Sequence, residues 1–267
     1  GNLILATQYI EESAALFQRN EDAWGYSGLM GNLAEIYALG GEYERARQAA
    51  QVGLEVAEQA GSLFQMGSCQ IVLGTLAYAR GDISLAKSYL ESALDNARMI
   101  GLQVKVAVAL VELAKIVAHL GNLNQSEAYI NEATDIYTET GNRWGLSQAW
   151  QYAGMLAIQR KHWSQAKQLL LQSLRLAWEI GAIPICIHTL YSISFVLADM
   201  GQSQNALTTL TFCQQHSDQR YFAFAEDVLL ETELLKLLSP ANTNRAQAVG
   251  RQIQLGDLIS QMFTWLS

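Results

Sequence analysis

From Gly41 to Gly201, every twentieth residue of this 267-residue chain is a glycine, and Lys161 is the single exception in that run. Glycine readily adopts the left-handed backbone conformation that commonly follows the last residue of an α-helix, whereas other residues adopt it only at a steric cost. The even spacing therefore predicts a series of helices of about 15 to 18 residues, each ended by a glycine and joined to the next by a short turn.

A second pattern recurs every forty residues and separates two kinds of helix. One kind, here named helix B, places a small, an apolar and a small residue at spacings of four and three, as in Ala86, Leu90 and Ala93, which puts all three on one helical face. The other kind, helix A, carries an apolar residue directly before a small one, as in Leu33–Ala34 and Leu73–Gly74. Because a small residue lets another helix approach closely, the repeating unit is predicted to be a packed helix pair.

These residues resemble the tetratricopeptide repeat (TPR), whose helix A carries a large residue, a Leu-small pair and then Tyr or Ala, and whose helix B carries Ala, a large residue and Ala. The pattern runs nearly throughout NLAEIYALGGEYERARQAAQVGLEVAEQAG and VLGTLAYARGDISLAKSYLESALDNARMIG, and Trp150 occupies the family's tryptophan position. The resemblance covers about residues 2 to 215. The forty-residue unit exceeds the family's usual unit of about 34 residues, and such long repeats look like those of bacterial signalling ATPases and maltose-regulator-type activators.

The resemblance implies an all-α fold, a right-handed α-α superhelical solenoid of TPR-like helix pairs. The low proline content, two residues in the whole chain, also favours helices over strands or long linkers. We expect a single solenoid over residues 1–267. Its expected parts are helix B of a truncated repeat at 2–20, full repeats at 22–61, 62–101, 102–141, 142–181 and 182–220, and a last helix pair with a C-terminal cap at 221–267.

The C-terminal region departs from the glycine pattern. Tyr221 stands where a glycine is expected, and Ser239–Pro240 is predicted to end a sixth helix A. The remaining tail is expected to break at Gly250 or Gly256 into a final short helix. Because terminal repeats need a cap over an otherwise bare interface, the apolar residues of this helix are predicted to supply it. These are Leu255, Leu258, Ile259, Met262, Phe263 and Leu266.

Charge and composition exclude several partners and settings. The chain has 17 Lys and Arg against 25 Asp and Glu, a net charge of −8, so it lacks the basic surface that drives nucleic-acid binding. The longest apolar runs, 104–120 and 183–198, contain Lys, Glu or His and keep the repeat phase, which is typical of buried helices and argues against membrane spans. No signal peptide precedes the first repeat, and three cysteines without CxxC spacing favour a reduced, cytoplasmic location.

No catalytic or metal-binding pattern accompanies the repeats. The four histidines lie in different repeats, and none has a second histidine or a cysteine at metal-ligand spacing. Walker, dinucleotide-binding and nucleophile-elbow motifs are absent from the sequence. Cys213 occupies a small-residue core position, which indicates packing and not reactivity. We therefore expect no enzyme activity, no cofactor and no metal; an enzymatic role would need a pocket that joins groups such as Glu112 with His119, or Asp199 with His188.

In the TPR family, helix A lines a concave groove, and the resemblance implies a partner-facing surface here. Aligned on the Leu-small pair, these positions are small in the early repeats and become polar, apolar or aromatic in the third to fifth. Amides can pair with a peptide backbone, Met and aromatic side chains supply apolar anchors, and a cation takes an acidic group. The residues predicted to bind a protein or peptide are Lys115, His119, Gln148, Gln151, Met155, Gln159, His188, Tyr191, Phe195 and Asp199.

Alternatives stay open for several of these residues. For Met155, Tyr191 and Phe195, packing between neighbouring helices is as good an interpretation as ligand binding. For Lys115, the alternative interpretation is an ordinary lysine exposed to solvent. The Lys, Asn and Arg clamp with which some family members hold a chaperone's terminal carboxylate is missing, since Gly31, Glu35 and similar residues stand there. Chaperone tails are therefore not expected as ligands.

Two further features allow two interpretations each. Gly25, Gly28 and Gly31 form a stripe in one helix, where each costs up to about 1 kcal/mol relative to Ala. Either another protein element packs on the stripe, or large side chains of the preceding helix, such as Phe17, fill it. Trp178 marks either a second contact surface or a half-buried ring at the edge of the stack.

The expected function is a non-catalytic protein- or peptide-binding TPR module, the sensor or interaction arm of a larger bacterial signalling or regulatory protein. Residues 3–19 resemble a helix B without its helix A, and the chain begins with Gly, so an effector domain of the same chain is expected upstream. The alternatives are a static scaffold that joins two proteins and a solenoid that senses a small molecule. Fold alone does not decide among them.

Overall fold

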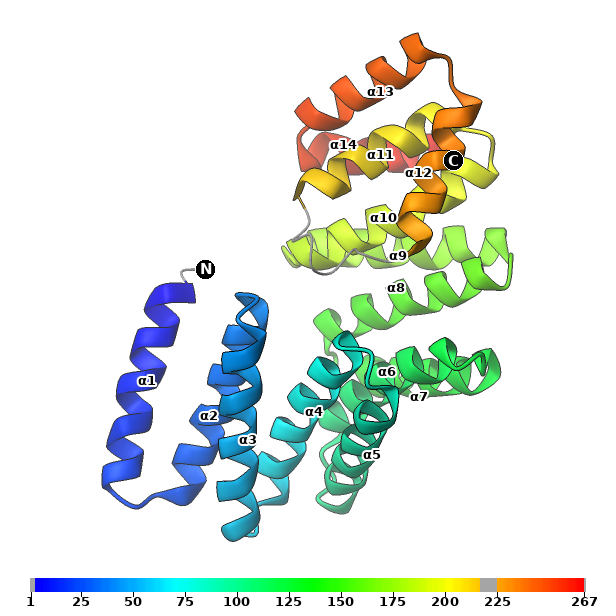
Figure 1. Ribbon diagram of the computed structural model, residues 1–267. Helices are drawn as coiled ribbons and strands as arrows, with labels where there is room; N and C mark the ends of the chain where they lie inside the picture. The colour runs from blue at the N-terminus through cyan, green and yellow to red at the C-terminus, as the bar shows by residue number, and fades with distance from the viewer. Residues whose placement is uncertain (1–2, 217–224, 267) are drawn as a thin grey trace. The chain divides into compact units, whose positions relative to one another are not determined.

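The computed structural model describes residues 3–216 and 225–266 of the chain. Those residues form fourteen α-helices and no strand (Figure 1). The helices that follow the repeat are α1 (Leu3–Arg19), α2 (Ala23–Leu39), α3 (Tyr43–Gln59), α4 (Leu63–Ala79), α5 (Ile83–Met99), α6 (Gln103–His119), α7 (Leu123–Glu139), α8 (Arg143–Gln159), α9 (Trp163–Glu179), α10 (Ile183–Asp199) and α11 (Ser203–His216). The helices α1 to α10 are each 17 residues long, within the predicted range. The predicted all-α repeat fold is confirmed.

The turns explain the glycine spacing. All eight glycines of the run have φ between 65° and 83°, as predicted for residues that follow a helix end. After α2, the Gly41 amide donates to the Ala38 carbonyl and the Glu42 amide to the Tyr37 carbonyl, which is the Schellman arrangement. Lys161 keeps the same turn at φ 59°, and so does Glu21 at φ 56°, which lies on the same twenty-residue spacing and was not predicted.

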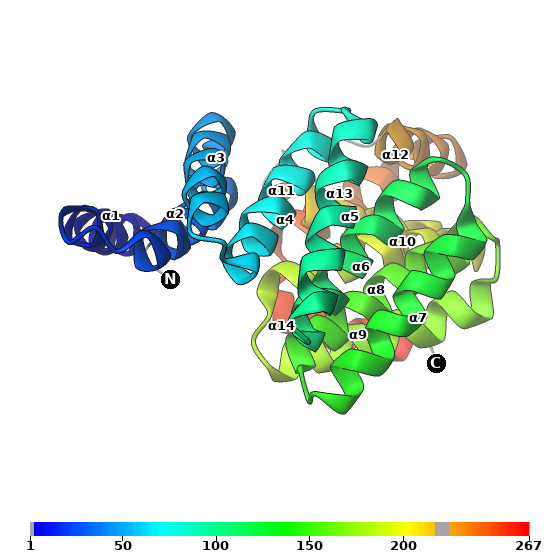
Figure 2. The ribbon, with the colours of Figure 1, turned by 90° about the horizontal axis from the view of Figure 1, so that it is seen from below.

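The chain divides into two compact units, unit 1 (Gly1–Thr140) and unit 2 (Gly141–Ser267). In unit 1 the A helices α2, α4 and α6 alternate with the B helices α1, α3, α5 and α7, and each helix packs on the next. Helices α2 and α3 lie side by side in both views (Figure 1 and Figure 2). The A helices also contact one another, α2 with α4 and α4 with α6.

The core of unit 1 is built on the small residues of the repeat. Ala34, Ala46 and Ala50 are fully buried and pack with Leu33 and Leu73. These small residues of α2 and α3 let the two helices of the pair approach closely, as the spacing predicted.

The glycine stripe of α2 is filled by the chain itself. A Cβ at Gly25 would overlap the Phe17 ring, one at Gly28 would lie 2.7 Å from Gln65 Nε2, and one at Gly31 would lie 3.5 Å from Cys69 Sγ. Phe17 comes from α1, as one interpretation held, whereas α4 provides the other two neighbours.

Unit 2 begins with the pairs α8–α9 and α10–α11 and then departs from the repeat in α12 (Ala225–Leu237), α13 (Pro240–Gln252) and α14 (Leu255–Trp265). Helix α11 contacts α13 more extensively than it contacts α12. The predicted helix end at Ser239–Pro240 is confirmed, since α13 begins at Pro240 with Ser239 as its N-cap. Tyr221 lies outside the described residues.

The expected break at Gly250 or Gly256 is wrong. The interruption falls at Ile253 and Gln254, which have extended backbones with ψ of 140° and 150°. Gly250 serves a close helix approach instead, whereas Gly256 makes an ordinary contact. A Cβ at Gly250 would lie 2.5 Å from the Thr208 carbonyl oxygen of α11, and one at Gly256 would lie 3.5 Å from the Trp178 ring of α9.

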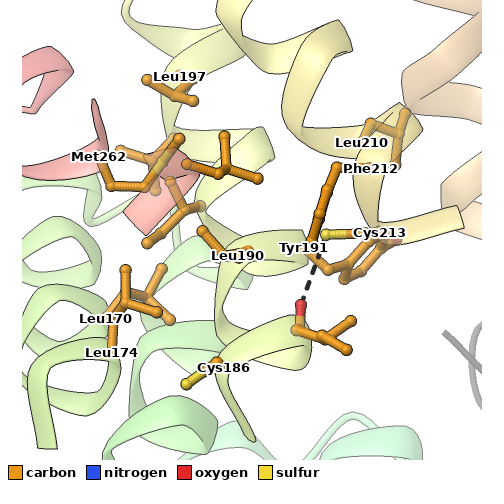
Figure 3. Packing of buried hydrophobic residues seen from close by; sticks show 14 of the residues in the cluster. Leu170, Leu174, Cys186, Leu190, Tyr191, Leu197, Leu210, Phe212, Cys213 and Met262 are labelled. Carbon is orange, nitrogen blue, oxygen red and sulfur yellow. Dashed lines mark hydrogen bonds between the residues drawn. The ribbon is translucent and has the colours of Figure 1, made fainter. Parts of the chain in front are cut away.

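Helix α14 folds back on the earlier helices of unit 2. Leu258, Ile259, Met262 and Leu266 are at most 2% exposed, and Leu255 and Phe263 are partly buried against the same core cluster. Figure 3 shows Met262 within this cluster, together with residues such as Leu170 and Leu190. All six apolar residues expected in the cap therefore lie in or against the core of unit 2.

Polar and aromatic contacts fix the position of α14. Gln202 Nε2 donates to the Trp265 carbonyl oxygen at 2.8 Å, and the Arg175 guanidinium lies 5.3 Å from the centre of the Phe263 ring. Trp178 stands against Gly256 and is 44% exposed. The tryptophan therefore has a neighbour from its own chain at the edge of the stack, and it remains exposed.

No helix within the described ranges has the length and apolar character needed to cross a bilayer.

Candidate partner-binding surface

The predicted binding residues are divided between the two units. Lys115 and His119 lie on α6 in unit 1, and the other eight lie on α8 and α10 in unit 2.

In unit 1, Lys115 is engaged by a neighbour on its own helix. Its Nζ donates to Glu112 Oε1 at 2.5 Å, and the two side chains are only 16% and 13% exposed. Burial, and then the Glu112 carboxylate, raise the pKa of Tyr137. His119 is exposed, and its ring meets the Tyr78 ring of α4 edge-on at a centroid distance of 5.9 Å. The cation of Lys115 is thus largely balanced by Glu112.

In unit 2, the helices α8 and α10 contact each other. Buried hydrogen-bonded side chains, Gln151 of α8 and Ser192 of α10, join the two helices and are here named the floor. Gln151 is 5% exposed, and its Nε2 donates to Ser192 Oγ at 3.2 Å, so this amide links two A helices. Ser192 Oγ in turn donates to the His188 carbonyl oxygen at 3.2 Å. Gln148 and Met155 on α8 are half-buried, and Gln159 is exposed.

The aromatic residues of α10 pack together. Tyr191 is 8% exposed and meets Phe195 edge-on at a centroid distance of 5.3 Å. Phe195 is partly buried against the core cluster, His188 is half-buried, and Asp199 is exposed at the end of the helix. Tyr191 and Gln151 therefore lie behind the surface that Gln148, Met155, His188 and Phe195 present.

A second buried network supports this floor. Ser173 Oγ of α9 donates to the Ser147 carbonyl oxygen at 2.7 Å and lies 3.1 Å from Thr189 Oγ1. Within the described part of the chain, every buried side-chain nitrogen or oxygen has a hydrogen-bond partner. A floor whose polar groups are all paired is expected to hold its shape when a ligand binds.

The cysteines are free thiols buried in the core. Burial raises the pKa of Cys69 to about 12 and that of Cys186 to about 11, and it raises the pKa of Cys213 as well. Cys213 Sγ donates to the Ile187 carbonyl oxygen at 3.6 Å (Figure 3). Because the thiolate is the reactive form, these thiols are packing residues. Among the described residues, no three His, Cys, Asp or Glu side chains gather as metal ligands would.

One set of surface residues was missed by the family-based alignment. Trp24, Phe64, Val104 and Trp144 are 61%, 41%, 38% and 50% exposed, and each is the second residue of an A helix. They precede the family's helix A pattern, because the longer repeat adds a turn there. Their exact forty-residue spacing is the sequence signal that would have found them.

Comparisons with known proteins bear on the fold. No family model matches the chain. No curated protein matches it either. Solved structures do: a Rap protein complexed with competence and sporulation factor aligns with a TM-score of 0.72 and 16% identity over 99% of this chain and 72% of the other. BtubC (BKLC) from P. vanneervenii aligns with a TM-score of 0.60 and 15% identity over 95% and 94%.

A third similar structure is a signal transduction ATPase with numerous domains (STAND) from Pyrococcus horikoshii, which has a tetratricopeptide repeat sensor. It aligns with a TM-score of 0.63 and 14% identity over 99% of this chain, which corresponds to 43% of that protein. At these identities the likeness shows the fold. The chain is a TPR-like helical repeat protein and resembles the sensor-bearing STAND protein in architecture.

Proposed function

We propose that the chain is a non-catalytic protein- or peptide-binding module and that its ligand lies along α8 and α10. The observation that carries the proposal is the mixed surface of Gln148, Met155, His188 and Phe195 above a fully hydrogen-bonded floor. Repeat arrays of this type present extended surfaces to their partners.

The chemistry of this surface suits an extended peptide. Met155 and Phe195 offer apolar contacts, whereas Gln148 and His188 offer hydrogen-bonding groups for a peptide backbone. Gln151 and Tyr191 act from behind as positioning residues. In unit 1, Lys115 and His119 are proposed as a further contact for an acidic group, with Glu112 moderating the charge.

We further propose that the module is the sensor or interaction arm of a larger cytoplasmic signalling protein of bacterial type, with its effector upstream in the same chain. Two similar structures support this role by analogy, the Rap protein complexed with competence and sporulation factor and the STAND protein with a repeat sensor. Residues 1–267 would then act as one repeat array in which ligand binding shifts the packing of neighbouring repeats.

The test begins with peptides selected from a displayed random library against the purified chain. Hydrogen exchange with a selected peptide is expected to protect 143–159 and 183–199. Gln148→Ala with His188→Ala should weaken binding at least about tenfold. The matched control changes exposed glutamines of helix α9, Gln165→Ala with Gln172→Ala, and should leave affinity unchanged.

Either of two results would remove this proposal: protection confined to the B helices, or equal loss of affinity in the control variant. Changes in exchange far from the bound peptide separate a sensor from a static scaffold, which would show protection at the contact alone.

A further inference from the structure

The open face of α8 begins one turn before the predicted binding residues. Spacings of four, three and four residues place four side chains on one face of this helix. They are Trp144, Gln148, Gln151 and Met155. Trp144 is 50% exposed, and Gln148 and Met155 are half-buried. The candidate surface therefore starts with a large aromatic ring.

Local hydrogen bonds fix the backbone that carries Trp144. Asn142 is the N-cap of α8, and its Oδ1 accepts from the Gly145 amide at 2.9 Å. Ser147 Oγ donates to the Trp144 carbonyl oxygen at 2.8 Å. An aromatic side chain on a fixed helix start offers a large contact area at a low cost in conformational entropy.

The start of a helix in this fold requires no apolar residue at its second position. In the B helices α3, α5, α7 and α9 that residue is polar and exposed: Glu44, Ser84, Asn124 and Ser164. A single exposed apolar side chain is common on proteins. What ties Trp144 to the candidate surface is its alignment with Gln148 and Met155 on the same face of α8.

Helix α10 has one open line of residues beside this face. From Ile185 to Leu197, every residue other than His188 and Phe195 is buried. Helix α9 joins α8 to α10 through short turns at both of its ends, so α8 and α10 run in the same direction, and the two helices contact each other. Phe195 is therefore the apolar contact that α10 offers to a ligand.

Helix geometry gives the distances between the apolar side chains. Trp144 and Met155 are eleven positions apart, which is about 16.5 Å along α8. An extended peptide covers that distance in about five residues, so its two side chains would point to opposite faces.

The path from Trp144 to Phe195 is longer and fits an extended peptide. Phe195 lies forty positions after Met155, at the same level of the neighbouring helix, about 8 to 10 Å to the side. The diagonal path is therefore about 19 Å, or about six residues of extended chain. Side chains six positions apart lie on the same face of an extended peptide.

We propose that Trp144 belongs to the α8–α10 site and that this site selects an extended peptide with two large apolar side chains six positions apart, one on Trp144 and one on Phe195. Gln148 and His188 lie beside the middle of that path, where they can pair with the peptide backbone. This inference rests on the proposed function and deepens it, because it names the pattern of the ligand and makes Trp144 a specificity-determining residue.

The test is a selection of displayed peptides of about twelve random residues, long enough to contain the pair, against the purified chain and against Trp144→Ala. The purified chain should enrich peptides with two aromatic or large aliphatic residues six positions apart. Trp144→Ala should enrich peptides that keep one of the two. The matched control is Trp24→Ala, because Trp24 is 61% exposed at the same second position of α2 in unit 1. It should enrich the same pair as the purified chain.

A selected peptide labelled with fluorescein then measures the size of the effect by anisotropy. Trp144→Ala should weaken binding at least about tenfold, whereas Trp24→Ala should change it less than about twofold. Trp144→Phe, which keeps an aromatic ring, should retain most of the affinity. Alanine at the peptide residue seated on Trp144 should weaken binding to the purified chain and cause no further loss in Trp144→Ala, because that contact is already absent.

The outcomes separate this inference from the proposed function. Selected peptides that protect α8 and α10 from hydrogen exchange but lack the six-position pair would overturn the inference alone. The same holds if such peptides bind Trp144→Ala as tightly as the purified chain, or if their apolar residues are five positions apart. A selection that yields no peptide, or only peptides that leave α8 and α10 unprotected, would overturn both.

Discussion

The two units use the same helix pair but treat their outermost helices differently. In unit 1, α1 leaves Tyr9 and Leu16 exposed at 59% and 58%. In unit 2, the tail turns back, and Leu258 and Met262 of α14 are fully buried against residues of the preceding helices. A helix inside a repeat array packs one apolar face on each of its neighbours. The outermost helix therefore keeps an apolar face exposed unless another element covers it.

Charge separates the units as well. Unit 1 has more than twice as many acidic as basic side chains, whereas unit 2 has 8 acidic and 9 basic. Unit 1 is therefore strongly acidic, whereas unit 2 is nearly neutral. One repeat pattern thus carries two units of different charge.

The largest effect is expected from shortening two buried side chains of α14. Leu258→Ala with Met262→Ala should destabilise unit 2 by about 2–5 kcal/mol per residue, because each removes a fully buried side chain. The urea concentration at which each unit unfolds is measured by thiol labelling. Cys186 and Cys213 report on unit 2, and Cys69 reports on unit 1. Labelling of Cys186 and Cys213 should shift to lower urea while that of Cys69 shifts much less.

Leu16→Ala is the matched control for this pair, because Leu16 is 58% exposed. It should change stability by no more than about 0.5 kcal/mol. Equal effects of Leu16→Ala and Met262→Ala would show that α14 does not close unit 2.

Two glycines give effects of opposite sign. Gly250→Ala in unit 2 should cost about 1–3 kcal/mol, since the new Cβ would lie 2.5 Å from a backbone oxygen of α11. Gly67→Ala in unit 1 should stabilise by up to about 1 kcal/mol, because its nearest neighbour would be 3.7 Å away and alanine favours helix. Urea unfolding followed by circular dichroism measures both, and a gain from Gly250→Ala would contradict the close approach of α13 to α11.

A smaller effect concerns the turns. Lys161→Gly should stabilise unit 2 by about 1 kcal/mol, because Lys161 has φ 59° in a conformation that favours glycine. Gly121→Lys in unit 1, where φ is 83°, should cost a similar amount. Thermal unfolding midpoints that move in the same direction for both variants would refute the shared turn.

The smallest effect is expected from the exposed ion pairs. Arg98→Gln in unit 1 removes a 2.7 Å contact with Glu132, and Arg143→Gln in unit 2 removes a 2.5 Å contact with Glu179. Each should cost about 0.2–1 kcal/mol, less at high salt, because both partners are about half exposed. A loss above that range in one unit, measured by urea unfolding at low and high salt, would show that its pair belongs to a larger network.

The regular part of the fold was predictable because its signals are local. The glycine spacing predicted the helix ends. The twenty-residue spacing of the turns continues through Lys161 because the neighbouring helices pack as in the other repeats. The break after α13 was not predictable from glycine alone, since Gly250 is required for close helix approach and Gly256 lies within the first turn of α14.

The candidate site was harder to predict for a physical reason. An alignment indicates the face of the helix on which a residue lies. It does not indicate which neighbouring residue the side chain contacts. Gln151 thus binds Ser192, Tyr191 packs on Phe195, and Lys115 pairs with Glu112. The exposed apolar residues at the starts of the A helices, such as Trp24 and Phe64, lay outside the family pattern altogether. The binding roles of the ten predicted residues stay predictions until a ligand is found.

The contact between Gln202 and the Trp265 carbonyl joins residues 63 positions apart, whereas the repeat helices pack mainly on their immediate neighbours in the chain. During synthesis on a ribosome, the early helix pairs can fold as soon as they emerge, because their partners are already present. Helix α14 does not follow this order, because it can dock only after residue 265 has left the exit tunnel. Until then the apolar face of the preceding helices is open, so the interval before α14 emerges is the stage of synthesis at which unit 2 most needs protection from aggregation.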